Sequence, residues 1–250
     1  MIELSSLARR LEGAQAQLNE KLNQAAGGRS MAVGGGYAHF RGPGHPLNQA
    51  LGLTAALTEP ELEAVEQFLG APTVLELSPG ADPALWALLA RRGYRVHQFQ
   101  QLWVRPLAAQ QADPVEDIRI VRPEEAELYN RLVGAGFMER ADWQLFEPPF
   151  STPLEVPGTF GFIVSVGGEP AGGGLLGMVD GVALLSGDSV LPQFRGRRLQ
   201  RRLIEARLRT ALEFGCDVAC AGTAPMTASQ RSYEACGFRA AYPKLELARG

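Results

Sequence analysis

The segment Arg195-Gly196-Arg197-Arg198-Leu199-Gln200 has the composition of an anion-binding loop. It precedes a helical pattern in which Leu199, Leu203 and Ala206 share one face, and five arginines lie between positions 195 and 202. The first N–H groups of a helix have no intrahelical acceptor, and the helix dipole is positive there. Because Gly196 lets a ligand approach the backbone closely, the segment predicts a site for a pyrophosphate.

A different interpretation of the arginine run is a solvated helix face. Binding of nucleic acid is disfavoured, because the chain has a formal net charge of -3 and no aromatic residues alternate with the arginines for base stacking. Membrane binding has no support either, because no apolar run reaches the ~18 residues that a transmembrane helix needs. We therefore expect neither nucleic acid nor a membrane as partner.

Candidate acid and base residues lie on both sides of this loop. Tyr233 comes four residues before the pair Gly237-Phe238, and Asp188 ends a strand-like run just before the loop. A tyrosine can serve as general acid and a carboxylate as general base. Glu139 and Asp142 are further candidates for the base. Tyr233 as a packed core residue, the three acids as surface charges, and a water chain in place of a base remain alternatives.

Two spaced motifs resemble the GNAT acetyltransferase family. The first is V-x-P-x-x-R-G-x-x-L, present as Val190-Leu191-Pro192-Gln193-Phe194-Arg195-Gly196-Arg197-Arg198-Leu199, and the second is Tyr233-Glu-Ala-Cys-Gly237-Phe238. The order of strands and helices from residue 118 to 250 also follows that family's fold. The resemblance covers the C-terminal half of the chain.

The resemblance implies acetyl-CoA as co-substrate, without a metal, and direct attack by the amine of a small-molecule or amino-acid-like acceptor. Tyr233 and Asp188 are then the catalytic candidates, Tyr233 protonating the leaving thiolate, and a backbone N–H near Val190 polarises the carbonyl. Ser229 and Gln230 either cap the last helix or touch the pantetheine arm. The residues assigned to acetyl-CoA are Ser189, Val190, Leu191, Arg195, Gly196, Arg197, Arg198, Leu199, Gln200, Arg201, Ser229 and Gln230.

Two loop positions depart from the family pattern. Arg198 stands where the family usually has glycine, and Gln200 where it has glycine or alanine. A side chain is tolerated at a helix start when φ is negative, so Arg198 is expected to swing outward, to add a cation to the phosphates, or to fill the site. The last outcome would give a non-catalytic acyl-CoA-binding or scaffold protein, which is our alternative function.

The pattern of elements predicts an α/β (α+β) fold with a mixed central sheet flanked by helices. Segment 2–24 has helical leucine spacing, segment 31–40 resembles a strand interrupted by glycines, and helices are expected over 58–69 and 83–92. Further expected elements are strands at 73–77, 94–107, 118–121, 160–166, 170–178, 182–190, 217–221 and from 238 onward, and helices at 123–132, 199–215 and 228–236.

The first half echoes the second. Val74 to Val96 and Val218 to Ala240 both contain a strand, a turn, a short helix, a Gly-aromatic-Arg sequence and a second strand, with Leu89 at the position of Tyr233. We therefore predict two tandem GNAT-like halves: a degenerate domain over 1–112 and a catalytic-type domain over 117–250, joined by a linker near 108–117. The first half shows no equivalent phosphate loop, since Arg41-Gly42-Pro43-Gly44 lacks a following helix.

The remaining composition is that of an ordinary globular chain. It has 46% hydrophobic residues and only three cysteines, Cys216, Cys220 and Cys236, which we expect to be buried and unpaired. His39, His45 and His97 are scattered, so no metal site is predicted. The arginine bias indicates a GC-rich bacterial genome, and the N-terminus has no signal-peptide pattern. We expect a cytoplasmic protein that is a monomer or homodimer.

Overall fold

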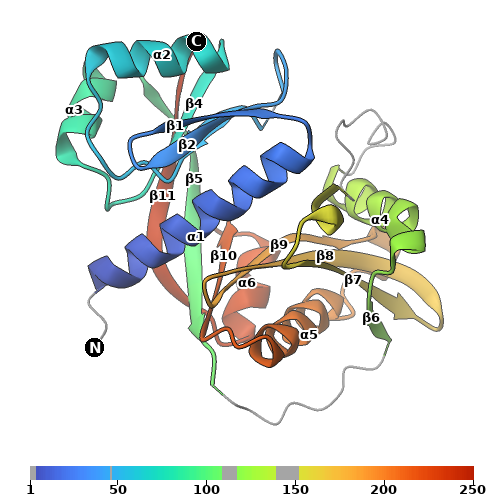
Figure 1. Cartoon of the computed structure of the whole chain (residues 1–250). Helices are drawn as coiled ribbons and strands as arrows, with labels where there is room; N and C mark the ends of the chain where they lie inside the picture. The colour runs from blue at the N-terminus through green and yellow to red at the C-terminus, as the bar shows by residue number, and fades with distance from the viewer. Residues whose placement is uncertain (1–3, 46, 109–116, 139–151) are drawn as a thin grey trace. The chain divides into compact units, whose positions relative to one another are not determined.

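The computed structural model describes residues 4–45, 47–108, 117–138 and 152–250 of the chain (Figure 1). They divide into two compact units. The first unit comprises Met1–Leu102 with Ala241–Gly250, and the second comprises Trp103–Ala240. Two long strands, β5 (Arg95–Pro106) and β11 (Arg239–Arg249), contribute residues to both units.

The first unit contains a mixed sheet in the order β1-β2-β3-β4-β11-β5. The pairs β1–β2, β2–β3 and β4–β11 are antiparallel, whereas β3 and β4 run parallel. Its other elements are α1 (Leu4–Ala25), β1 (Arg29–Val33), β2 (Gly36–Phe40), β3 (Gln49–Leu51), α2 (Glu59–Leu69), β4 (Thr73–Leu77) and α3 (Pro83–Arg91).

Helices cover both faces of this first sheet. Successive residues of a strand point to opposite faces. On β2, Ala38 joins the apolar core that α2 and α3 supply, whereas the next residue, His39, meets Glu20 of α1, with 3.3 Å between Nδ1 and Oε2. Strand β11 is held to α1 by a buried ion cluster, in which the Lys244 ammonium lies 3.0 Å from carboxylate oxygens of both Glu12 and Glu76.

The second unit has a mixed sheet in the order β5-β10-β9-β8-β7-β6, of which β9 and β10 pair in parallel. Strands β7, β8 and β9 form an antiparallel meander. Its elements are β6 (Ile118–Ile120), η1 (Pro123–Glu125), α4 (Ala126–Met138), η3 (Thr152–Glu155), β7 (Thr159–Val166), β8 (Glu169–Val179), β9 (Val182–Val190), η4 (Pro192–Phe194), α5 (Leu199–Glu213), β10 (Val218–Thr223) and α6 (Ala228–Ala235).

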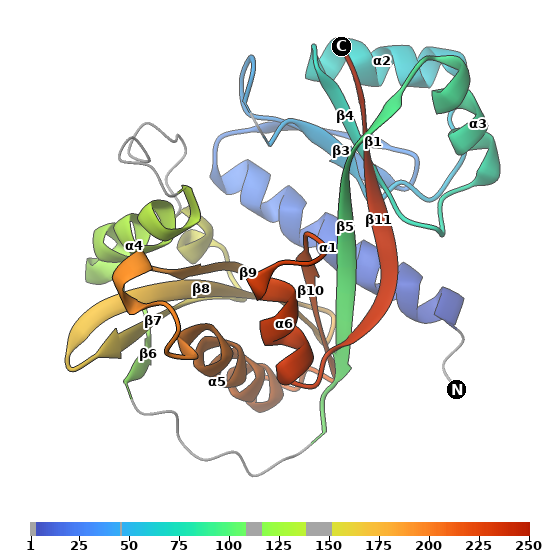
Figure 2. The same ribbon diagram turned by 180° about the vertical axis from the view of Figure 1, so that it is seen from behind.

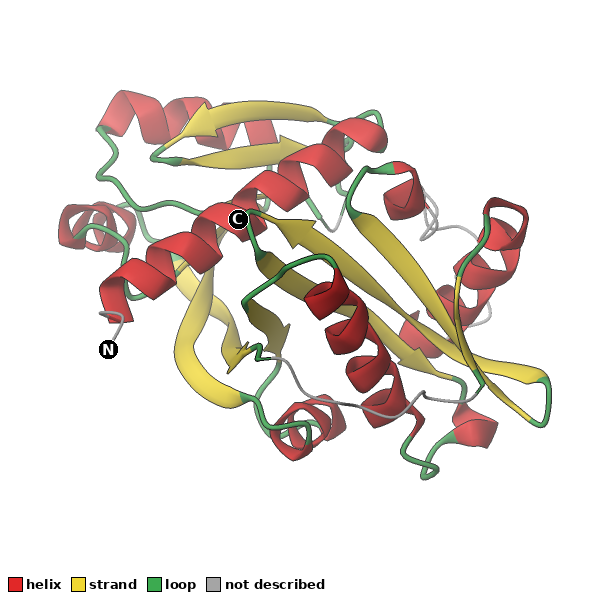
Figure 3. Cartoon of the chain, turned by 60° about the horizontal axis from the view of Figure 1, so that its bottom comes forward, coloured by secondary structure: helices red, strands yellow, loops and turns green. Residues whose placement is uncertain are grey.

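In the second unit, α4 and α5 pack on opposite faces of the meander (Figures 2 and 3). Phe162 of β7 belongs to the core that also contains Leu199, Leu203 and Ile204 of α5. The next residue, Ile163, packs with Tyr129 and Leu132 of α4. The apolar face that the sequence predicts for 199–206 is therefore confirmed, and it covers the β7–β9 meander.

Most predicted elements are confirmed, with two corrections. Segment 31–40 is a hairpin of two strands, because Gly34 and Gly35 both take positive φ and close a turn between β1 and β2. The three-residue strand β3 has no counterpart in the prediction, since so short a run gives no periodicity. The repeated strand–helix–strand unit is confirmed as β4-α3-β5 and β10-α6-β11. The linker residues 109–116 lie outside the described residues, so the bounds 1–112 and 117–250 stay predictions.

Candidate active site

Strands β9 and β10 separate partway along their length. The parallel pairing joins Val182–Leu184 only to Val218–Cys220, although β9 continues to Val190 and β10 to Thr223. Beyond Leu184, one edge of β9 therefore has no registered partner in β10. An extended ligand with amide groups can bind such an edge as an additional strand does.

Val190 presents its backbone to this free edge. The N–H of the next residue, Leu191, donates to Ala171 on the β8 side at 2.9 Å. Because adjacent residues of a strand direct their N–H and C=O groups to opposite edges, the N–H and C=O of Val190 face away from β8. The carbonyl accepts from Nε of Arg195 at 3.1 Å. The Val190 N–H can therefore donate a hydrogen bond to a carbonyl of a ligand that lies between the separated strands β9 and β10.

The loop before α5 is open and positively charged. Arg195, Gly196, Arg197 and Arg198 are all exposed, and Gly196 has φ +78° with no atom within 4 Å of where a Cβ would be. No side chain caps the helix start, so the first-turn amides from Leu199 onward have no intrahelical acceptor and no capping partner. These observations fit the requirements of a pyrophosphate, which such amides and arginines bind.

Arg198 departs from the conformation that the sequence analysis assumed. It is the N-cap residue of α5 and has left-handed backbone, with φ +60° and ψ +19°, instead of negative φ. Its side chain is exposed, as in the first of the three outcomes considered for it. The backbone keeps the shape that favours glycine, and the arginine carries a cost of about 1–2 kcal/mol for adopting it.

This strain predicts a difference between two variants that both remove the guanidinium. Arg198→Gly is expected to be about 1 kcal/mol more stable than Arg198→Ala, because alanine retains the Cβ that disfavours the left-handed backbone. Denaturant unfolding of the two proteins measures this difference. Equal stability would show that Arg198 does not take the left-handed conformation in solution.

Gln200 connects α5 to α6. Its amide nitrogen donates to the Ser229 hydroxyl and its amide oxygen accepts from the Ser232 hydroxyl, both at 3.0 Å. Two residues predicted to contact the co-substrate, Gln200 and Ser229, therefore contact each other. Because Ser232 precedes Tyr233, this link ties the helix that carries Tyr233 to the loop.

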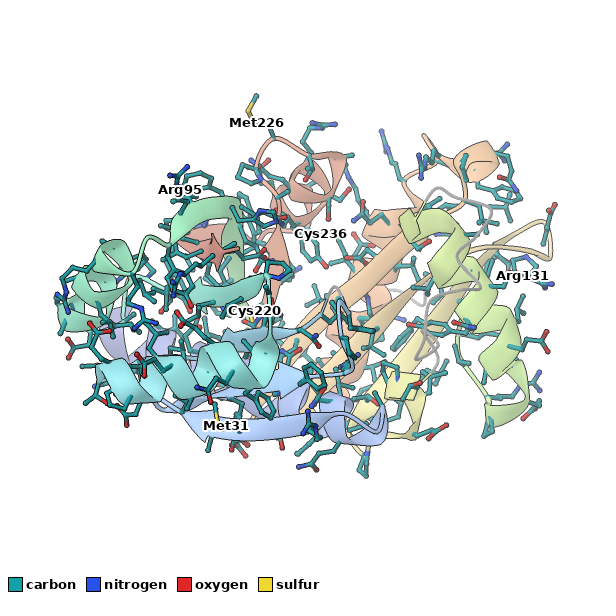
Figure 4. All side chains as sticks on the ribbon, turned by 90° about the horizontal axis from the view of Figure 1, so that it is seen from above. Met31, Arg95, Arg131, Cys220, Met226 and Cys236 are labelled. Atoms are coloured by element: carbon teal, nitrogen blue, oxygen red, sulfur yellow. The ribbon has the colours of Figure 1, made fainter. Side chains whose placement is uncertain are left out.

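The N-terminus of α6 is capped by Thr227, which the sequence analysis overlooked. Its hydroxyl accepts from the Gln230 N–H at 3.3 Å, and the Gln230 side chain accepts in return from the Met226 N–H at 2.7 Å. Of the two alternatives for Gln230, participation in the cap is the one observed. Met226 lies at the tip of this turn, with its side chain 90% exposed (Figure 4).

Asp188 lies in a buried cluster with Tyr233 and Arg207. The Tyr233 hydroxyl donates to Oδ2 of Asp188, and the Arg207 guanidinium donates to Oδ1. Tyr233 is 1% exposed and Arg207 0%. Three more of the five guanidinium hydrogens go to the carbonyls of Leu203, Leu175 and Ser186, at 3.0 to 3.2 Å. The structure thus brings the two predicted catalytic residues, Asp188 and Tyr233, together and places Arg207 beside them.

Charge and burial shift the titration of this cluster. Burial, followed by the nearby Asp188 carboxylate, raises the pKa of the Tyr233 hydroxyl well above its usual range. For Arg207, burial acts to lower the pKa, but the Asp188 carboxylate outweighs it and the pKa is raised. Tyr233 is thus a neutral phenol and Arg207 a cation throughout the physiological range.

Glycines let large side chains reach the sheet beside Asp188. Strand β9 contains an extra residue between Ser186 and Ser189, opposite Gly174 of β8, which makes a bulge at Gly187 and Asp188. A Cβ on Gly174 would lie 2.9 Å from the Arg207 guanidinium. On the opposite face, a Cβ on Gly173 would lie 3.3 Å from the Tyr129 ring. The glycines therefore make room for Arg207 and Tyr129.

The model of the acetyltransferase (GNAT) family matches residues 122–238, which span the loop, the separated strands and the Asp188 cluster. These residues belong to the GNAT family. The matched GNAT domain lies within the second unit, which also contains β6 and the last residues of β5, from Trp103 onward. Among curated proteins, none matches the chain.

Solved structures resemble the chain in fold. A GCN5-related N-acetyltransferase from Kribbella flavida has a TM-score of 0.69 and 19% identity, with 96% of this chain and 95% of that chain covered. A tandem GNAT protein from the clavulanic acid biosynthesis pathway has a TM-score of 0.55 and 17% identity, covering 87% and 80%. A GCN5-related N-acetyltransferase from Sphaerobacter thermophilus has a TM-score of 0.53 and 13% identity, covering 76% and 64%.

In the first unit, the helix start that corresponds to the loop before α5 is capped. Its parallel pair β3 and β4 corresponds in order to β9 and β10 of the GNAT domain, so α2 takes the place of α5. There the Thr58 hydroxyl accepts from the Glu61 N–H while the Glu61 carboxylate accepts from the Thr58 N–H, and Glu59 adds a negative charge. A capped and acidic helix start disfavours an anion, so the start of α2 does not resemble the phosphate-binding start predicted for α5.

The remaining predicted residues lie outside the Asp188 cluster and the loop before α5. The Ser189 hydroxyl donates to the Leu132 carbonyl of α4 at 2.9 Å and is buried. Glu139 and Asp142 lie outside the described residues. The three cysteines are buried thiols, as expected, and burial raises the pKa of the Cys236 thiol to about 11, which keeps it protonated at neutral pH. Across the described residues, no helix is long and apolar enough to cross a membrane.

Arg207 and Tyr129 were absent from the sequence-based candidates, although each left a signal. Arg207 lies four residues after Leu203, so it falls on the apolar face of α5, where a charge needs a buried partner. The run Gly172-Gly173-Gly174 inside a strand marks a close approach by another group. Each signal shows that a residue needs a neighbour from another element, but neither shows which residue that neighbour is.

Proposed function

We propose that the GNAT domain transfers the acetyl group of acetyl-CoA to the amine of a small-molecule or amino-acid-like acceptor by direct attack. Acetyl-CoA supplies an activated thioester when bound. The amides of residues 195–201 and the arginines beside them bind its pyrophosphate, and the free edge of β9 at Ser189, Val190 and Leu191 binds the pantetheine arm. The observation that carries this proposal is the joint placement of this loop, that edge and the Asp188–Tyr233 pair.

The chain's own groups have distinct tasks in this reaction. The Val190 N–H stabilises negative charge on the carbonyl oxygen, as an oxyanion donor does. Tyr233 holds the proton that the leaving sulfur needs, and its raised pKa keeps that proton in place at neutral pH. Asp188 is the carboxylate nearest to this hydroxyl and serves as its partner.

Thiol release from acetyl-CoA in the presence of a panel of amines tests the proposal. We expect release that depends on one class of amine, together with the acetylated amine by mass spectrometry. Unchanged thiol levels with every amine, despite saturable binding of CoA by calorimetry, would contradict it. That outcome would favour the alternative of a non-catalytic acyl-CoA-binding protein, whose motivation is Arg198 at a position where the family usually has glycine.

A further inference from the structure

The hydroxyl proton of Tyr233 is already used in the structure. It is donated to Oδ2 of Asp188 in a cluster that is almost closed to water, since the Asp188 side chain is only 9% exposed. A phenol has one proton, and it cannot donate that proton to a carboxylate and to a leaving sulfur at the same time. Once Tyr233 has protonated the sulfur, its oxygen is a phenolate beside the Asp188 carboxylate, and a proton returned from Asp188 restores the neutral phenol.

Asp188 has a suitable oxygen for this exchange. The Arg207 cation donates to Oδ1 and its charge disfavours a proton there, so Oδ2, which Tyr233 already contacts, is the oxygen better suited to gain a proton. A carboxylate oxygen has two lone pairs, so Oδ2 can accept from Tyr233 and from a second donor together. Oδ2 of Asp188 can therefore receive a proton from a second donor while it remains in contact with the Tyr233 hydroxyl.

We propose that Asp188 and Tyr233 act as one proton relay between the acceptor amine and the leaving sulfur, with Arg207 as the positioning residue that fixes Asp188. This inference rests on the proposed acetyl transfer and assigns its proton path. The amine nitrogen uses its lone pair to form the N–C bond, and the C–S bond breaks with its electron pair remaining on sulfur. The N–H proton passes to Oδ2 of Asp188.

The Tyr233 proton then passes to the sulfur, and the proton on Oδ2 passes to the phenol oxygen. Asp188 ends as a carboxylate and Tyr233 as a neutral phenol, so the pair is restored without exchange with bulk water. One proton has moved from nitrogen to sulfur, which balances the reaction of amine and thioester to amide and thiol. The dry surroundings favour this path, because water is scarce as a competing donor.

Arg207 fixes the position from which the relay works. Its guanidinium is held by three carbonyls and by Asp188, and Gly174 leaves the space that it fills. Rotation of the Asp188 carboxylate would exchange Oδ1 and Oδ2, and the fixed guanidinium opposes that rotation. Arg207 positions Asp188 and also contacts the Tyr233 hydroxyl, where its positive charge acts to lower the pKa of that hydroxyl, against the larger effects of burial and Asp188.

A double-mutant cycle in kcat tests the relay. Asp188→Asn and Tyr233→Phe are each expected to lower kcat by roughly 10²–10⁴-fold. Members of one relay are not independent, so the double variant is expected to lose no more than the worse single variant. Losses that multiply in the double variant would overturn the relay, because they would show that the residues act separately.

A second measurement needs neither acetyl-CoA nor turnover. In Tyr-labelled protein, the Tyr233 ring signal, assigned with Tyr233→Phe, is expected to stay that of a neutral phenol in the wild type up to the highest pH at which the protein is folded. In Asp188→Asn the ionisation of Tyr233 moves to lower pH, since the carboxylate that raises its pKa is gone. Ionisation at the same pH in both proteins would contradict the contact on which the relay depends.

Arg207 is tested by comparing Arg207→Lys with Arg207→Met, after circular dichroism has shown that each is folded. Lysine retains a cation and is expected to restore part of kcat and of the Tyr233 titration relative to methionine. If both variants keep wild-type kcat, Arg207 has no positioning role. If no amine is acetylated by the wild type, the proposed function fails. If an amine is acetylated but the kcat losses of Asp188→Asn and Tyr233→Phe multiply in the double variant, only the relay is refuted.

Discussion

Replacing Tyr233 by phenylalanine is expected to lower kcat for acetyl transfer by roughly 10²–10⁴-fold, the usual contribution of a general acid. The affinity for CoA is expected to change little, because Tyr233 is buried beside Asp188 whereas the loop arginines proposed to bind the pyrophosphate are exposed. The measurement is steady-state thiol release at saturating acetyl-CoA, paired with calorimetric titration of CoA.

Tyr242→Phe provides a matched control for this variant. Tyr242 is also a buried tyrosine that donates to a buried carboxylate, with 2.7 Å from its hydroxyl to Oε1 of Glu12, but it belongs to the first unit. Both variants lose a hydrogen bond to a charged group, which costs about 1.5–3 kcal/mol of stability. An equal fall of kcat in the two variants would show that lost stability, rather than lost chemistry, causes the effect.

Separating Asp188 from Arg207 is expected to destabilise the GNAT domain by about 3–5 kcal/mol. In Asp188→Ala, the Arg207 guanidinium stays fully buried with carbonyl acceptors but without a compensating negative charge. Removing both charges in Asp188→Asn with Arg207→Met is expected to recover much of that loss, since no buried charge remains unpaired. Denaturant unfolding followed by circular dichroism measures all three proteins.

The exposed pair Arg202–Asp117 is the control for this effect. Its closest N–O distance is 3.9 Å, and its side chains are 33% and 53% exposed. Breaking it by Arg202→Ala is expected to cost no more than about 1 kcal/mol, the usual value for a surface pair. A loss in Asp188→Ala as small as that in Arg202→Ala would contradict the buried cluster.

The sequence was most informative where local chemistry decides the structure. The capped start of α2 at Thr58 and Glu61, the helix start before Leu199 and the repeated strand–helix–strand units all follow from short-range patterns. Tyr233 and Asp188 could be proposed singly for the same reason. Their contact could not be predicted, because it joins residues 45 positions apart across two elements.

Other features depend on tertiary packing that a single sequence does not contain. The left-handed backbone of Arg198 opposes the intrinsic preference of arginine, so only the surrounding loop can impose it. The burial of Arg207 depends on the space that Gly174 leaves in another strand. Thr227 is the N-cap of α6, and the spacing S/T-x-x-Q from Thr227 to Gln230 marks it in the sequence. The prediction considered only Ser229 and Gln230 as cap residues and therefore missed Thr227.

CoA is expected to bind to the GNAT domain at the start of α5. Titration of CoA into isotopically labelled protein, followed through the backbone amide signals, measures this binding. We expect saturable shifts at residues 195–201 and at Val190, and unchanged signals at the capped start of α2 around residues 58–61. Unchanged signals at 195–201, or shifts confined to the first unit, would contradict it.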